Sequence, residues 1–152
     1  MFSPHVTVAC VIQYKQKYLV VEEQDHGRIV FNQPAGHLEA NESLISAVKR
    51  EVKEETGLEI EPQGFIGSYL FTSPVNQVTY LRFCFYYQFE QAPPACKPQD
   101  ADIINCHWLT LDELKQQQTK LRSALVLEVI EDYVAGQQGD LSLIKHFPLA
   151  TV

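Results

Sequence analysis

The chain has 152 residues, 45% hydrophobic and 20% charged, which is enough to bury the core of one globular domain without disulfide or metal staples. We therefore expect a single domain over residues 1–152. A formal net charge of −7 argues against a nucleic-acid-binding protein, because such proteins need a basic surface. No apolar run approaches the ~20 residues that span a bilayer, and the start MFSPH lacks the features of a secretion signal, so we expect a cytoplasmic protein without membrane contact.

Two β-branched runs begin the chain, at residues 5–13 and 18–23, and the polar residues between them predict a β-hairpin. Residues 31–38 are rich in turn formers and predict a loop. We expect a helix over residues 42–56, with Asn41 as its N-cap and Gly57 ending it.

The second half of the chain returns to strands, expected at residues 64–71, 78–89 and 103–109. The sequence TLDE at residues 110–113 has the form of a capping box and predicts a helix start. Residues 121–134 predict a further helix, ended by Gly136. Strands on both sides of one central helix, with helices at the end, indicate an α/β (α+β) fold in which helices pack on a mixed sheet.

The helix expected over residues 42–56 has an unusual distribution of charge. At about 100° per residue, its apolar side chains form one stripe that faces a core; they are Leu44, Ile45, Val48 and Val52. Three glutamates fall beside this stripe and form what we call the acidic edge, Glu51, Glu54 and Glu55. Like charges at such spacings destabilise a helix, and only Arg50 projects to the same side to compensate them.

Two interpretations of the acidic edge are open. Most runs of glutamate form a solvated surface patch. Alternatively, carboxylate oxygens in excess of the local positive charge suit hard cations such as Mg²⁺ or Mn²⁺, which bind through a few carboxylates plus substrate phosphates. The turn Pro34-Ala35-Gly36 ahead of the helix offers backbone groups to complete such a site.

A spaced motif decides between them. Gly36, Glu42 and the run REVKEETGL at residues 50–58 match every defined position of the Nudix box, G-x5-E-x7-R-E-U-x-E-E-x-G-U. On these residues the chain resembles the Nudix hydrolases. The resemblance implies the Nudix fold, an α/β/α sandwich around a mixed sheet, and a metal-dependent hydrolase of phosphoanhydride bonds that uses Mg²⁺ or Mn²⁺.

Other stretches resemble one type within this family, the NudJ-type bacterial phosphatases. These stretches are PHVTVAC, LVVEE, NQPAGHLEA and LRF. The resemblance implies release of phosphate from small diphosphate compounds, namely nucleoside di- and triphosphates, thiamine diphosphate and hydroxymethylpyrimidine diphosphate. Two alternatives stay open: a Nudix pyrophosphohydrolase of another nucleotide derivative, such as a dNTP or ADP-ribose, and a non-catalytic nucleotide sensor. The protein is expected to act as a monomer or a homodimer.

By the same resemblance, the acidic edge holds the metal ions, together with a backbone carbonyl of the Ala35-Gly36 turn. Glu51 and Glu54 are then catalytic residues, and Arg50 orients the carboxylates through charge-assisted hydrogen bonds. The metals orient the anhydride, neutralise the developing charge and lower the pKa of the attacking water.

Glu42, Gly36 and Gly57 are the structural positions of the motif, and Glu42 is expected to brace the loop. Outside the box, many family members use an acidic residue from the loop before a strand that carries a tryptophan. Asp102, six residues before Trp108, is the expected counterpart, and Asp100 is its rival.

Three residues are candidates for binding the substrate. Arg82 lies in the aromatic run of residues 78–89 and is a candidate to bind a phosphate of the substrate. Gln33 and Tyr69 are candidates to line the pocket and to meet a base or pyrimidine ring by hydrogen bonding and stacking. His37 lies inside the box, at a position where the motif specifies no residue. It is either a phosphate contact or an exposed loop histidine without a function.

Overall fold

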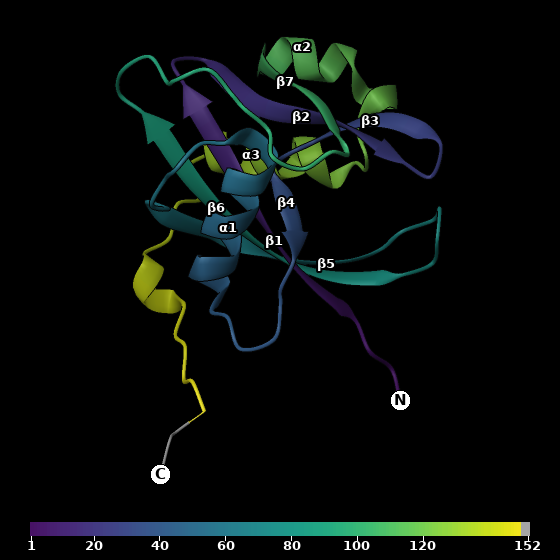
Figure 1. Ribbon diagram of the computed structural model, residues 1–152, viewed down its shortest axis with the longest axis vertical. Helices are drawn as coiled ribbons and strands as arrows, with labels where there is room; N and C mark the ends of the chain where they lie inside the picture. Colours follow the sequence, from purple (N-terminus) through teal and green to yellow (C-terminus); the bar gives the residue numbers. More distant parts are fainter. Residues whose placement is uncertain (150–152) are drawn as a thin grey trace.

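The computed structural model describes residues 1–149 (Figure 1). Its seven strands belong to one sheet and are β1 (His5–Tyr14), β2 (Lys17–Asp25), β3 (Arg28–Asn32), β4 (Ala35–His37), β5 (Gly64–Thr72), β6 (Thr79–Phe89) and β7 (Ile103–Thr110). The helices are α1 (Leu44–Thr56), α2 (Leu111–Gln116) and α3 (Leu125–Val134), with short 3-10 helices η1 (Gln118–Lys120) and η2 (Leu141–Leu143).

The sheet is mixed, as the order of elements predicts. Its main path is β3-β2-β1-β6-β5, with β4 paired to β1 and β7 paired to β2. Only β1 and β6 run parallel, and the other pairs are antiparallel. Along its length β1 changes partner on one side: Thr7 to Ala9 pair with β4, whereas Gln13 and Tyr14 pair with β2. This exchange brings the turn that precedes α1 against the middle of the sheet.

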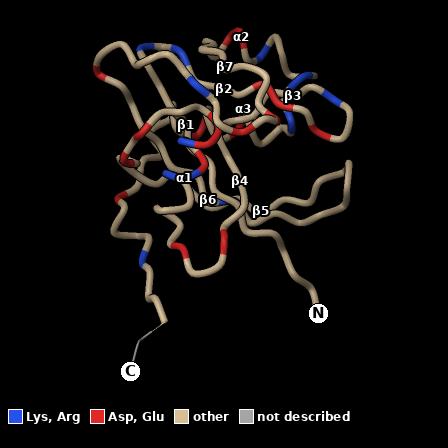
Figure 2. Tube along the Cα trace, viewed as in Figure 1, with Lys and Arg blue, Asp and Glu red and all other residues tan. Residues whose placement is uncertain are grey.

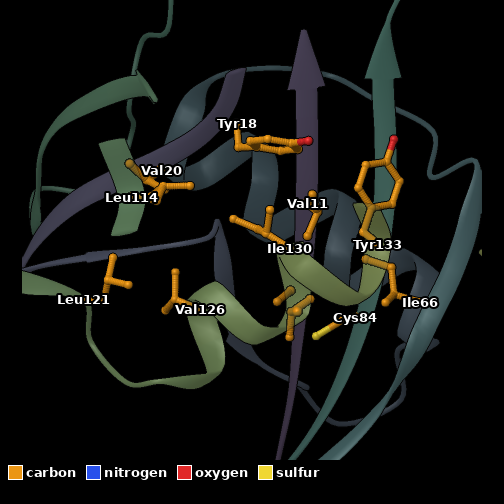
Figure 3. Packing of buried hydrophobic residues seen from close by; sticks show 12 residues of the cluster. Val11, Tyr18, Val20, Ile66, Cys84, Leu114, Leu121, Val126, Ile130 and Tyr133 are labelled. Atoms are coloured by element: carbon orange, nitrogen blue, oxygen red, sulfur yellow. The ribbon is translucent and has the colours of Figure 1, made fainter. Parts of the chain in front are cut away.

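The two faces of the sheet are covered by different helices, because apolar side chains alternate along the central strands. On the α1 face β1 contributes Val8, Cys10 and Ile12 to a buried cluster. On the α3 face the same strand contributes Ala9 and Val11 to a second cluster (Figure 3). Helix, sheet and helix therefore form the three expected layers.

Helix α1 begins two residues later than the sequence suggests. The Ser43 side chain accepts a hydrogen bond from Ser46 N, so Ser43 is the N-cap. The prediction of Asn41 as N-cap is wrong, because Asn41 has a φ of 66° and lies in a turn ahead of the helix. The predicted end is confirmed: Gly57 adopts a left-handed φ of 75° and donates its backbone N–H to Lys53 O.

Other differences also arise from tertiary pairing. The segment 31–38, predicted to be a loop, instead contains the short strand β4 and the end of β3. Its backbone forms these strands because it pairs with β1 and β2. The helix predicted from Leu121 begins instead at Leu125, since Leu121 bridges to Phe31 and the backbone N–H of Arg122 bonds Phe31 O. The capping box at Thr110 and Glu113 is present. No helix within residues 1–149 has the length and apolarity to cross a membrane.

Candidate active site

The carboxyl-terminal half of α1 lies against β4, and a glycine makes this close approach possible. A Cβ built on Gly36 would overlap the carboxylate of Glu51. Any larger residue here would push Glu51 or the strand aside. Gly36, the first defined glycine of the motif, is thus the residue at which β4 meets the acidic edge.

Arg50 gathers the carboxylates around it. Its guanidinium donates to both oxygens of Glu42, at 3.0 and 2.7 Å, and to Glu51 Oε1 at 2.7 Å. It lies 3.4 Å from Glu54 Oε2 and donates to the backbone carbonyl of His37 at 3.0 Å. These bonds lower the pKa of Glu42, most strongly through the side-chain bond from Arg50. Because Arg50 also bonds the backbone of His37, it ties the helix to β4.

Glu55 is buried, and no lysine, arginine or histidine of the described chain forms an ion pair with it. Its side chain is 5% exposed, and its Oε1 accepts a hydrogen bond from Ala35 N at 2.8 Å. Burial, in the presence of Glu23 and Glu51, raises the pKa of Glu55 to about 9. Burial also raises the pKa of Glu51, against the opposing effect of Arg50. A bound cation would stabilise the ionised form of a buried carboxyl that has further carboxylates beside it.

The donor set fits a hard divalent ion. The acidic edge offers only oxygen ligands, which Mg²⁺ and Mn²⁺ prefer. Within residues 1–149, no three acidic, histidine or cysteine side chains already lie in an arrangement that could hold one metal ion. Glu51 instead contacts Arg50, and Glu55 contacts the backbone of Ala35. Both contacts are made by Oε1 of the carboxylate.

Two residues of the acidic edge, Glu51 and Glu55, line a cavity of about 410 Å³. Acidic side chains on its wall include Glu51, Glu55, Asp100 and Asp102. Basic side chains on its wall are Arg28, Arg82 and Arg122. Figure 2 shows red and blue segments gathered around α1 and around β2 and β3. One cavity therefore presents both carboxylates and guanidiniums to a ligand.

The loop after residue 95 docks on the end of α1. The backbone N–H groups of Gln99 and Asp100 both donate to Glu54 O, and Asp102 N donates to the Asp100 side chain at 2.9 Å. Both aspartates line the cavity. Asp100, but not Asp102, is among the charges that raise the pKa of Glu51 and Glu55, after the larger effect of burial.

The structure brings some of the predicted substrate residues to the cavity and leaves others out. Arg82 and His37 line it. Gln33 is 1% exposed and donates to the backbone carbonyl of Val126, so it lies in the interior. Tyr69 packs against the α3 core and donates to Asp132 at 2.7 Å. Neither Gln33 nor Tyr69 is part of the cavity wall, because their hydrogen bonds hold them against α3.

Other residues of the cavity wall were not apparent from the sequence. Arg122 pairs with Glu23 at 2.8 Å, and Asn32 donates to the same carboxylate at 3.4 Å. Arg82 Nη2 donates to Asn32 Oδ1 at 3.4 Å and makes no ion pair within residues 1–149. No motif marks Arg122, which lies far from the box in sequence and enters the site because Leu121 and the backbone N–H of Arg122 pair with Phe31 of β3.

A model of the NUDIX domain family matches residues 3–129 of this chain. The chain therefore belongs to the Nudix family and is a hydrolase that acts on phosphoanhydrides.

The most informative relatives are similar over nearly the whole chain. The protein called Phosphatase NudJ from Escherichia coli K12 is 46% identical over 147 residues, which cover 97% of this chain and 94% of that protein. Phosphatase NudJ of Shigella flexneri has the same identity and coverage. A solved NUDIX hydrolase from Nitrosomonas europaea superposes with a TM-score of 0.90 at 43% identity, covering 97% of this chain and 100% of that one.

A more distant structure supports the fold alone. The NUDIX domain of Shewanella oneidensis NrtR, solved in complex with ADP ribose, has a TM-score of 0.74 at 21% identity and covers 89% of each chain. The α/β/α architecture expected from the Nudix box is thus confirmed.

Proposed function

We propose that this protein is a magnesium-dependent phosphatase of the NudJ type, which removes phosphate from small diphosphate and triphosphate compounds. Its expected substrates are nucleoside di- and triphosphates, thiamine diphosphate and hydroxymethylpyrimidine diphosphate. The observation that carries the proposal is the cavity whose wall holds Glu51 and Glu55 together with Arg82. The 46% identity to Phosphatase NudJ supports the same type of reaction.

Each part of the cavity has a role in this proposal. The acidic edge would bind the divalent ions, which neutralise phosphate charge and lower the pKa of the attacking water. Arg50 holds Glu51 and Glu42 by short charged hydrogen bonds and so fixes the orientation of the ligands. Among residues 1–149 Arg82 makes no ion pair with a carboxylate, so its guanidinium is available to a phosphate oxygen.

Two other functions compete with this proposal. A Nudix pyrophosphohydrolase would use the same acidic edge but break a bond further from the terminal phosphate. A nucleotide sensor would bind in the same cavity without hydrolysis. The complete box and the burial of its Glu55 favour hydrolysis, because an uncompensated carboxyl is costly to retain without a cation.

A product-resolved assay tests the proposal. Incubated with Mg²⁺ and a nucleoside triphosphate, the protein should release phosphate and leave the nucleoside diphosphate, and a diphosphate should give the monophosphate. Release of pyrophosphate alone would identify a pyrophosphohydrolase instead. Binding of the same compounds without any product would identify a sensor.

The two aspartates of the docked loop should differ in importance. We expect Asp100→Asn to lower kcat about 10- to 100-fold, because the Asp100 carboxylate lies in the electrostatic field of Glu51 and Glu55. Asp102→Asn should have a smaller effect, although Asp102 also lines the cavity. Steady-state kinetics of both variants decide this, and the reverse order would restore Asp102 as the functional residue.

A further inference from the structure

The end of the cavity formed by β4, β5 and β6 carries an aromatic group that the phosphate chemistry does not use. We call it the ring wall, and it consists of Phe71, Tyr80 and His37. Phe71 and Tyr80 lie nearly parallel, at 22° and 5.8 Å between ring centroids. His37 is inclined to Tyr80 at a centroid distance of 6.4 Å. All three line the cavity.

These rings are not part of the protein core. Many aromatic side chains of β5 and β6, among them Phe65, Phe83 and Tyr86, pack against one of the two buried clusters. Phe71 and Tyr80 belong to neither cluster and face the cavity instead. An aromatic pair that fills no core and borders a ligand cavity needs another explanation.

The strand register places the ring wall one step beyond the phosphate-binding arginine. Tyr80 and Arg82 are two residues apart on β6 and therefore point to the same face, about 7 Å apart along the strand. Phe71 pairs with Tyr80 across the β5–β6 ladder, and His5 of β1 pairs with Tyr80 on the other side. A ligand whose phosphate binds Arg82 is therefore able to place its remaining part against Tyr80.

Hydrogen bonds hold the ring wall in place. Asn76 Nδ2 donates to the Tyr80 hydroxyl at 3.0 Å, from the turn that joins β5 and β6. His5 Nδ1 and His37 Nε2 share a hydrogen bond at 3.0 Å, and His5 meets Tyr80 edge-on at 5.7 Å. The hairpin that carries the wall extends to the same side of the molecule as the β2–β3 turn (Figure 1). Residues of both, including Asn76 and His26, line the cavity.

We propose that the ring wall is a binding subsite for the heteroaromatic ring of the substrate, with Tyr80 as its central residue. The occupant is a flat, nitrogen-containing ring joined by a short link to a diphosphate or triphosphate, which stacks on Phe71 or Tyr80. Diphosphates of sugars or alkyl chains lack a flat face and gain nothing from this surface. The inference rests on the proposed function, since it assumes that phosphates occupy the arginine side of the cavity.

Two inhibitors that differ only by the ring-bearing part test this subsite. Calorimetric titration with Mg²⁺ compares adenosine α,β-methylene diphosphate with methylene diphosphonate, neither of which is hydrolysed. The wild-type protein should bind the ring-bearing compound more tightly. Tyr80→Leu should weaken that binding about tenfold and leave the affinity for methylene diphosphonate unchanged. Tyr80→Phe, which keeps the ring, should restore most of the loss.

A matched control lies on the same strand. Tyr87 packs on the α1 side of the sheet, away from the cavity, so Tyr87→Leu should leave both affinities unchanged. Equal weakening of both compounds by Tyr80→Leu, or no weakening of either, would overturn the ring subsite. If the wild-type protein binds the ring-bearing compound through Tyr80 but hydrolyses no diphosphate, the subsite stands and the proposed function fails.

Discussion

Glu54→Gln should reduce turnover about a hundredfold or more while the protein stays folded. The side chain of Glu54 is 44% exposed and lies 3.4 Å from Arg50, so the substitution removes a charge without opening a cavity in the core. An exposed ion pair of this kind contributes at most about 1 kcal/mol to stability. Phosphate release with Mg²⁺ and thermal unfolding of the same samples measure the two effects.

A control for this experiment is available on the segment that follows α1. Glu61 is 77% exposed and pairs with Lys49, away from the cavity. Glu61→Gln should leave both kcat and the melting temperature unchanged. A Glu54→Gln protein with wild-type turnover would contradict the assignment of the acidic edge to catalysis.

Glu55→Gln should abolish activity and, in metal-free buffer, make the protein more stable. The wild-type carboxyl is buried beside other carboxylates, whereas a neutral amide keeps an oxygen to accept the bond from Ala35 N. Because burial raises the pKa of Glu55 to about 9, the folded protein keeps the carboxyl protonated at neutral pH, whereas the unfolded chain ionises it. The neutral amide should therefore remove a cost of at least about 1 kcal/mol, or about 2–4 °C in melting temperature for a chain of this size.

The pH dependence has a definite sign. Burial raises the pKa of Glu55 in the folded protein to about 9, from an ordinary value of 4.5. The folded state therefore binds the proton more tightly than the unfolded state, and this group's contribution to stability is lost as the pH rises between those two values. The advantage of the Gln variant should grow from pH 5 to pH 8 in melting experiments without metal.

Added Mg²⁺ supplies the decisive comparison. It should raise the melting temperature of the wild-type protein, because ligand binding stabilises the folded state, and should have less effect on the Glu55→Gln variant. The exposed pair of Glu59 with Lys53 provides a control, since Glu59→Gln should change neither stability nor its dependence on Mg²⁺. A Gln variant that melts below the wild-type protein at pH 8 would show that the buried carboxyl has a compensating partner.

Much of this architecture could be predicted from local patterns. The alternation of apolar residues in β1, the glycine at the end of α1 and the capping box before α2 each depend on neighbouring residues, and the structure contains all three. The start of α1 was misplaced because Asn41 and Ser43 are both good capping residues. Only the path of the chain before the helix distinguishes them.

The sequence alone is sufficient to identify the family and to place three glutamates on one edge of a helix, because the Nudix box lies within one turn and one helix, where spacing fixes which side chains are neighbours. The tertiary structure decided which distant residues complete the cavity. Tyr80 reaches it through strand pairing and Arg122 through a backbone hydrogen bond to β3, while Gln33 and Tyr69 are held against α3 by hydrogen bonds. Such contacts join residues far apart in the chain, and no local pattern of charge or hydrophobicity encodes them.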